Sequence, residues 1–239
     1  FLDGARRTLA EADRAVDDAK RTGAGELGRL RLAFSWSMRF DTLPAVGRVL
    51  RAKHPGIQLL VQEMWNAKMA PAFADGSIDL ALSLCPELSP GLEVEPIRRE
   101  RLVALLPNSH RLSSQSALPL SALAGEEFVL FPREVGPRLH DAFMAVYRHA
   151  GFEPHIRPES FHTGWDVGGL SEVPAVALAP ESVVSGLPPT LTAVRVSEPD
   201  DTLETCIVWR AAARSPAIDT CIAAAHEALA ASPRGVGVG

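Results

Sequence analysis

The order of apolar and polar positions predicts an α/β chain in which strands and helices alternate. Nearly unbroken apolar runs at 30–34 and 78–82, and a similar run at 57–64, are typical of strands covered by helices on both faces. Helical patterns lie between these runs. The order strand, helix, strand, helix, strand predicts the first part of an open sheet, whose ligand crevice lies outside the carboxyl ends of the strands.

Two helices are expected between these strands. The first runs from Met38 to Lys53, with apolar residues along one stripe, and His54-Pro55-Gly56 ends it. The second lies between Asn66 and Asp75, with Asn66 as a plausible cap and Gly76 as a plausible stop.

The rest of the chain continues the alternation in a second block. Strands are expected near 92–97, 102–106, 127–131, 155–160, 175–180, 191–196 and 204–210. Helices are expected at 118–123 and 138–149, and from Pro216 to the end of the ordered chain. If the last strand and helix return to the first block, the chain crosses between two lobes twice, which predicts a paired hinge.

The N-terminal segment has apolar residues three and four apart, the spacing of a helix that packs along another helix. Two interpretations remain open for it, namely an inter-subunit seam and an amphipathic helix lying on its own lobe. The expected division is therefore a linker and dimerisation helix at 1–22, a first lobe formed by 28–99 together with 204–232, and a second lobe at 100–203.

Composition narrows the class of protein. The 239 residues are 46% hydrophobic, enough for a full core, and the formal net charge of −5 argues against extensive phosphate contacts by this chain alone. We expect no membrane span and a cytoplasmic location. Seven histidines without metal-binding spacing and three cysteines without a CxxC pair predict no metal site, and we expect the cysteines to be structural rather than redox-active.

The first strand is followed directly by Ser35, Trp36 and Ser37. At a strand-to-helix turn, unpaired N–H groups and hydroxyls favour a carboxylate or another anion, and Trp36 is a candidate for stacking on a ligand. Two other interpretations remain open: Ser37 caps its helix, and Trp36 closes the lobe.

Several longer segments resemble the effector-binding portion of LysR-type transcriptional regulators. They are GRLRLAFSWSMRFDTLPAVGRVLRAKHPGIQLLVQE, FADGSIDLALSL, ERLVALLPNSHRL and AVALAPES, preceded by the heptad helix. The resemblance covers essentially the whole chain. It implies a two-lobe α/β fold similar to type 2 periplasmic binding proteins, preceded by a linker helix.

The resemblance also implies partners. A DNA-binding winged helix-turn-helix is expected upstream and is missing from this chain, so DNA would be contacted only through that absent domain. A small-molecule effector and a homodimer or homotetramer are expected, without a cofactor. The family's effector pocket maps onto Ser35 and Ser37, onto Asn66 and onto the loop near Arg133 to Gly136.

The remaining candidate ligand residues lie in the second block. Arg133 could clamp an acid bidentately, or it could be a solvated surface arginine, and Glu134 follows it. His162, Thr163 and Trp165 would suit an aromatic or heterocyclic ligand, although Trp165 could equally serve packing.

The function expected from these features is effector sensing and oligomerisation in a LysR-type DNA-binding regulator, with a small anionic or aromatic molecule bound between the lobes. A transporter solute-binding protein of the same fold is the alternative. An enzyme on this fold would need a poised acid or histidine, for which only Glu134, His162 and Asp166 are candidates, so we assign no catalytic residue.

Overall fold

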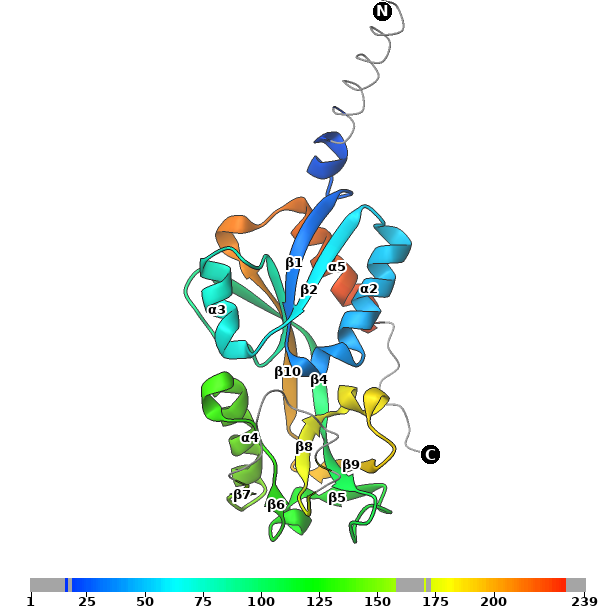
Figure 1. Ribbon diagram of the computed structural model, residues 1–239, viewed down its shortest axis with the longest axis vertical. Coiled ribbons are helices and arrows are strands. Elements are labelled where there is room, and N and C mark those ends of the chain that lie inside the picture. The colour runs from blue at the N-terminus through cyan, green and yellow to red at the C-terminus, as the bar shows by residue number, and fades with distance from the viewer. Residues whose placement is uncertain (1–15, 17–18, 158–169, 171–172, 231–239) are drawn as a thin grey trace, which may run out of the picture.

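The structure is a computed structural model that describes residues 16, 19–157, 170 and 173–230 (Figure 1). Its strands are β1 (Gly28–Phe34), β2 (Ile57–Glu63), β3 (Leu80–Leu84), β4 (Leu92–Pro107), β5 (Ala117–Pro119), β6 (Glu127–Phe128), β7 (His155–Ile156), β8 (Ala177–Pro180), β9 (Leu191–Glu198) and β10 (Thr202–Arg210). Its α-helices are α2 (Thr42–Lys53), α3 (Asn66–Ala74), α4 (Pro137–His149) and α5 (Pro216–Ala230). Short 3-10 helices are η1 (Trp36–Arg39), η2 (Leu120–Leu123), η3 (Arg133–Val135), η5 (Glu181–Gly186) and η6 (Ala211–Ala213).

The upper lobe in Figure 1 is built on a mixed sheet. Its strand order is β2-β1-β3-β10-β4, with β1 parallel to β2 and β3, and with β10 antiparallel to β3 and β4. Helices α2 and α5 pack together on one side of this sheet, and α3 lies on the other (Figure 1). Covering both faces explains why every residue of β3 is buried.

Strand β4 belongs to both lobes. Its residues 92–101 pair with β10, whereas residues 102–107 pair with β8 and β9, which form the lower lobe together with β5 (Figure 1). The chain returns where β9 ends at Glu198 and β10 begins at Thr202. Two neighbouring segments therefore connect the lobes, as the sequence predicted for a two-lobe fold.

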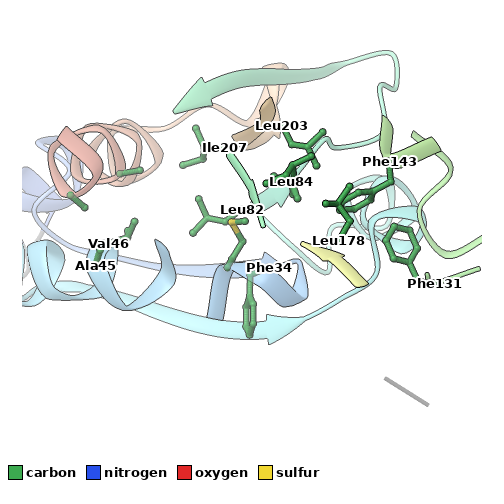
Figure 2. Close-up of a cluster of buried hydrophobic side chains, with 14 of the residues drawn as sticks. Phe34, Ala45, Val46, Leu82, Leu84, Phe131, Phe143, Leu178, Leu203 and Ile207 are labelled. Atoms are coloured by element: carbon green, nitrogen blue, oxygen red, sulfur yellow. The ribbon is translucent and has the colours of Figure 1, made fainter. Parts of the chain in front are cut away.

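One buried apolar cluster runs through both lobes (Figure 2). It extends from Val46 on α2 through Leu82 on β3 and Ile207 on β10 to Phe143 on α4 and Leu178 on β8. Full burial of each such side chain contributes roughly 2 kcal/mol to stability. The lobes are therefore held in this arrangement partly by continuous apolar packing.

Some predicted elements differ in the structure. The strand predicted at 57–64 is β2, and it is not covered on both faces, because its adjacent residues Leu60 and Val61 are 44% and 52% exposed. It is also the edge strand of the upper sheet. The helix predicted from Met38 is instead η1 followed by α2, since Asp41 leaves the helical region with φ −138°. The two strands predicted at 92–97 and 102–106 are one, β4.

Three shorter elements also differ. Only residues 127–128 of the segment 127–131 form a strand, and the helix at 118–123 is the short η2 after β5. The strand near 155–160 begins as β7, and its last residues lie outside the described part. Helix 138–149 and the helix from Pro216 are confirmed by α4 and α5.

The predicted helix at 1–22 lies mostly outside the described residues. Residues 16 and 19–23 are helical, and Gly25 follows with φ +75°, a conformation that glycine adopts without strain. Among the described residues, no helix is both long and apolar enough to cross a bilayer.

Candidate functional site

The turn after β1 is fixed by bonds to the neighbouring strand β3. The Ser35 N–H donates to the Leu82 carbonyl at 2.9 Å, and the Leu84 N–H donates to the Ser35 hydroxyl at 3.2 Å. Ser35 is 7% exposed. Its hydroxyl oxygen is thus already an acceptor, and its O–H remains available as a donor.

Ser37 lies in η1, and its side chain is 6% exposed. Within the described part of the chain its hydroxyl makes no hydrogen bond, and α2 begins beyond it with no side-chain cap. The interpretation of Ser37 as a cap for the following helix is therefore wrong, because the chain turns at Asp41 before α2 starts. The Ser37 oxygen is not among the fully buried polar atoms that lack a partner, so this free hydroxyl is accessible and is a candidate for a ligand contact.

Asn66 is brought next to this turn through Leu84. Its amide nitrogen donates to the Leu84 carbonyl at 2.8 Å, and its amide oxygen accepts a bond from the Ser83 hydroxyl at 2.9 Å. Both backbone groups of Leu84 are thus held by predicted site residues, Ser35 and Asn66. Asn66 is the first residue of α3 and Trp65 is the N-cap, so the expectation that Asn66 caps this helix is wrong.

Trp36 lies in η1 against the lower lobe. Its ring packs edge-on against Phe40 at a centroid distance of 4.8 Å, and both rings pack on the buried cluster that contains Val103 and Val183. The Ser185 hydroxyl donates to the Phe40 carbonyl at 3.1 Å. The turn that carries Ser35 and Ser37 therefore touches both lobes.

The predicted clamp residue Arg133 is engaged by its own lobe. Its guanidinium forms two bonds to the Asp141 carboxylate, at 2.8 and 2.7 Å, and its side chain is 60% exposed. Hydrogen bonding from Arg133 holds the pKa of Asp141 below its usual value. Glu134, beside it in η3, is exposed.

The loop of Arg133 and Glu134 nevertheless lies close to the upper lobe. A Cβ placed on Gly136 would lie 3.6 Å from the Cβ of Asn66, which is ordinary van der Waals contact. Trp65, next to Asn66, and Phe131 face each other with ring centroids 6.2 Å apart. The structure thus brings together Ser35, Asn66 and the start of α4, with Arg133 four residues before α4 along the chain.

A buried polar network lies where the lobes join. Glu100 on β4 is 4% exposed, and its carboxylate accepts bonds from Arg98, from the Thr205 hydroxyl on β10 and from the Ser182 N–H at the start of η5. Arg98 also binds Asp41, just before α2. Sequence reasoning missed this network, because its members lie on four segments and no local pattern links them.

His162, Thr163 and Trp165 lie outside the described residues. Sequence reasoning also missed Ser83 and Trp65. A serine inside the apolar run of β3 was an available signal, because a polar side chain in a strand buried on both faces needs a partner.

The cysteines and titratable groups give no sign of redox or metal chemistry in the described part of the chain. The three cysteines are free, and burial raises the pKa of Cys206 and Cys221 to about 12. Burial also raises the pKa of Cys85. Thiols with such pKa values are poor nucleophiles near neutral pH. No three His, Cys, Asp or Glu side chains of the described residues gather as metal ligands.

Comparisons with known proteins place these features in a family. The family model described as LysR substrate binding domain matches residues 23–230. The chain is 30% identical over 214 residues to the uncharacterized HTH-type transcriptional regulator YnfL of Escherichia coli, covering 87% of this chain and 71% of that protein. It is 26% identical over 182 residues to the HTH-type transcriptional regulator AlsR of Bacillus subtilis, covering 76% of this chain but only 60% of that protein.

Solved structures agree on the fold. CbnR, described as a LysR family transcriptional regulator, superposes with a TM-score of 0.83 at 23% identity, covering 94% of this chain and 78% of that chain. The BenM effector binding domain with its effector benzoate gives a TM-score of 0.72 at 23% identity, covering 84% of this chain and 92% of that chain. The chain therefore belongs to the LysR substrate-binding domain family and has the two-lobe effector-binding fold of LysR-type transcriptional regulators.

Proposed function

We propose that this chain senses a small effector for a LysR-type DNA-binding regulator and takes part in its oligomerisation. The effector, an anionic or aromatic molecule, binds between a first lobe of residues 28–99 with 204–232 and a second lobe of residues 100–203. The contact residues are those expected from the sequence, namely Ser35, Trp36, Ser37, Asn66, Arg133, Glu134, His162, Thr163 and Trp165.

The observation that carries this proposal is the Ser37 hydroxyl. It belongs to a nearly buried side chain, has no partner among the described residues, and lies in the turn that contacts both lobes. The O–H of Ser35 supplies a second donor two residues away. No histidine or lysine of the described residues hydrogen-bonds either serine, so the site offers donors for recognition rather than an activated nucleophile.

The relatives support the regulatory part of the proposal. BenM has benzoate as its effector, and CbnR has been seen bound to its target DNA. This chain spans 60% of the length of AlsR and 71% of that of YnfL, so DNA binding would be carried by a part of the protein outside the aligned region. An effector that binds one lobe arrangement more tightly would shift the population toward that arrangement.

A thermal-shift screen of benzoate and short carboxylic acids tests the proposal. At a ligand concentration of 100 times Kd, binding stabilises the native protein by roughly 2.7 kcal/mol, which is a clear rise in Tm. We expect Ser37→Ala to keep the unliganded Tm and to lose most of this rise.

Ser121→Ala is the matched control, because Ser121 is an exposed serine of η2 whose hydroxyl makes no hydrogen bond to the described residues. It should respond to acids as the unmodified protein does. The proposal fails if no aromatic or short acid raises Tm, or if Ser37→Ala and Ser121→Ala respond equally.

A further inference from the structure

Two hydrogen bonds, both donated by Arg138, join the lobes beside the candidate site. The Glu87 carboxylate, carried by the segment after β3 of the upper lobe, accepts a hydrogen bond from the Arg138 N–H at 2.9 Å. In the same direction, the Arg138 guanidinium donates to the Pro86 carbonyl at 3.4 Å. Arg138 is the second residue of α4, so these bonds tie the start of a lower-lobe helix to the upper lobe.

The upper-lobe side of this contact is the segment formed by Pro86 and Glu87, and its direction is set by the strained backbone of Cys85 and by hydrogen bonds from Asn66. Cys85 has φ +44°, a backbone conformation that is rare for residues other than glycine and costs of the order of 1 kcal/mol. The Asn66 amide donates to the carbonyl oxygens of Leu84 and, at 3.4 Å, of Cys85. Together these features direct Pro86 and Glu87 away from β3 and toward α4.

The lower-lobe side of this contact is the first turn of α4, which favours a negative charge nearby. The first turn of an α-helix has N–H groups without partners in the helix and carries a partial positive charge. No residue of α4's own lobe caps this end with a side chain, because the N-cap is Gly136. The pKa of Arg133 is raised first by its bond to Asp141, and the nearby charge of Glu87 adds to that effect. The capping group therefore comes from the other lobe.

We propose that Glu87 and Arg138 form a reversible clasp that favours the lobe arrangement seen here, and that breaking it loosens the contact between the lobes at this edge, while the shared apolar cluster keeps them joined. One bond of the clasp is exposed and the other is half-buried, so the clasp stabilises this arrangement modestly and can open without unfolding either lobe. Opening also separates Trp65 from Phe131 and Asn66 from Gly136, the contacts that adjoin it.

Hydrogen–deuterium exchange of the protein without any ligand tests the clasp. The variants are Glu87→Ala, Glu87→Gln, which keeps an acceptor oxygen but removes the charge, and the control Glu93→Ala. Glu93 is an exposed carboxylate on β4 for which the described residues offer no ion-pair partner. Exchange is followed in residues 64–68 of the upper lobe and 130–140 of the lower lobe.

We expect Glu87→Ala to speed exchange in both segments by about threefold to tenfold, with a smaller increase for Glu87→Gln and none for Glu93→Ala. An increase confined to the first turn of α4 would mean that Glu87 only caps that helix, and it would overturn the clasp. Equal exchange rates in Glu87→Ala and Glu93→Ala would also overturn the clasp. Because no ligand is present, the result does not depend on the proposed effector site.

Discussion

Arg98 on β4 and Asp41 before α2 form a paired salt bridge, with Nη1 to Oδ2 at 2.6 Å and Nη2 to Oδ1 at 3.1 Å. The same guanidinium bonds to the buried carboxylate of Glu100 at 2.8 Å. Burial opposes the charge on Arg98, but its bonds to Asp41 and Glu100 outweigh burial and raise its pKa. Arg98 thus holds two carboxylates where β4 passes between the lobes.

Replacing Arg98 should destabilise the protein strongly. Arg98→Ala leaves Glu100 buried without its cationic partner, and removing one member of a buried pair costs about 3 kcal/mol or more. The neighbouring Arg99 is a matched control, since its side chain is 76% exposed and it pairs with Glu204 only at 3.4 Å. Arg99→Ala should cost less than about 1 kcal/mol in urea unfolding. Similar costs for the two variants would contradict this account of the network.

Asn66→Ala should destabilise the protein through lost hydrogen bonds. The change removes the bonds that Asn66 makes to the Leu84 carbonyl and the Ser83 hydroxyl and leaves these two groups only their mutual contact at 3.4 Å, at a cost of about 2 kcal/mol. A double-mutant cycle with Ser83→Ala measures the coupling from the urea unfolding of the single and double variants. We expect the double variant to lose less stability than the sum of the single variants, and simple additivity would mean that the two side chains act independently.

Gly186→Ala should destabilise the contact between η1 and η5. A Cβ at this position would lie 2.1 Å from Cδ1 of Phe40, so the ring must move, at a cost of about 1 to 3 kcal/mol. Gly125→Ala is the control, because nothing lies within 4 Å of its added Cβ. In a Phe40→Leu background the penalty for Gly186→Ala should shrink, as measured by thermal unfolding. If Gly186→Ala destabilises the Phe40→Leu protein as much as the unmodified protein, the strain does not come from the Phe40 ring.

Asp79 should contribute stability that depends on pH. Hydrogen bonds from the Arg31 guanidinium, at 2.6 and 3.0 Å, lower the pKa of Asp79 below its ordinary value. A lowered carboxyl pKa stabilises the native state above the unfolded pKa of about 4, and this stability is lost as the pH falls through the lower native value. The difference in unfolding free energy between the unmodified protein and Asp79→Asn should therefore be largest near pH 7 and narrow below pH 4. A difference that is constant across this range would contradict the prediction.

The sequence alone predicts much of the local structure. The apolar run at 30–34 lies within β1, the run at 78–82 overlaps β3, which begins two residues later at Leu80, and the helical pattern at 138–149 becomes α4. It also places Ser35 and Ser37 directly after a strand. Such features depend on residues close in the chain, whose periodicity reflects which faces are covered.

The sequence could not predict which strand lies at an edge. The run at 57–64 resembles a fully covered strand, but β2 has only one neighbour, β1, and its residues Leu60 and Val61 are exposed. Strand order is a property of the whole sheet, because it depends on where later segments such as β10 pair. The apolar pattern of a single strand carries no information on its position in that order.

For the candidate site, the sequence determined the family, the order of elements and the presence of hydroxyls after the first strand. Only the tertiary structure decided that Ser35 and Asn66 meet at Leu84, that Arg133 is bound to Asp141, and that Glu87 reaches the start of α4. These partners are up to 51 residues apart in the chain. Contacts at that separation are set by how whole elements pack within a lobe and, for Glu87, between the lobes, and packing depends on the shapes and charges of both surfaces at once, which no local pattern records.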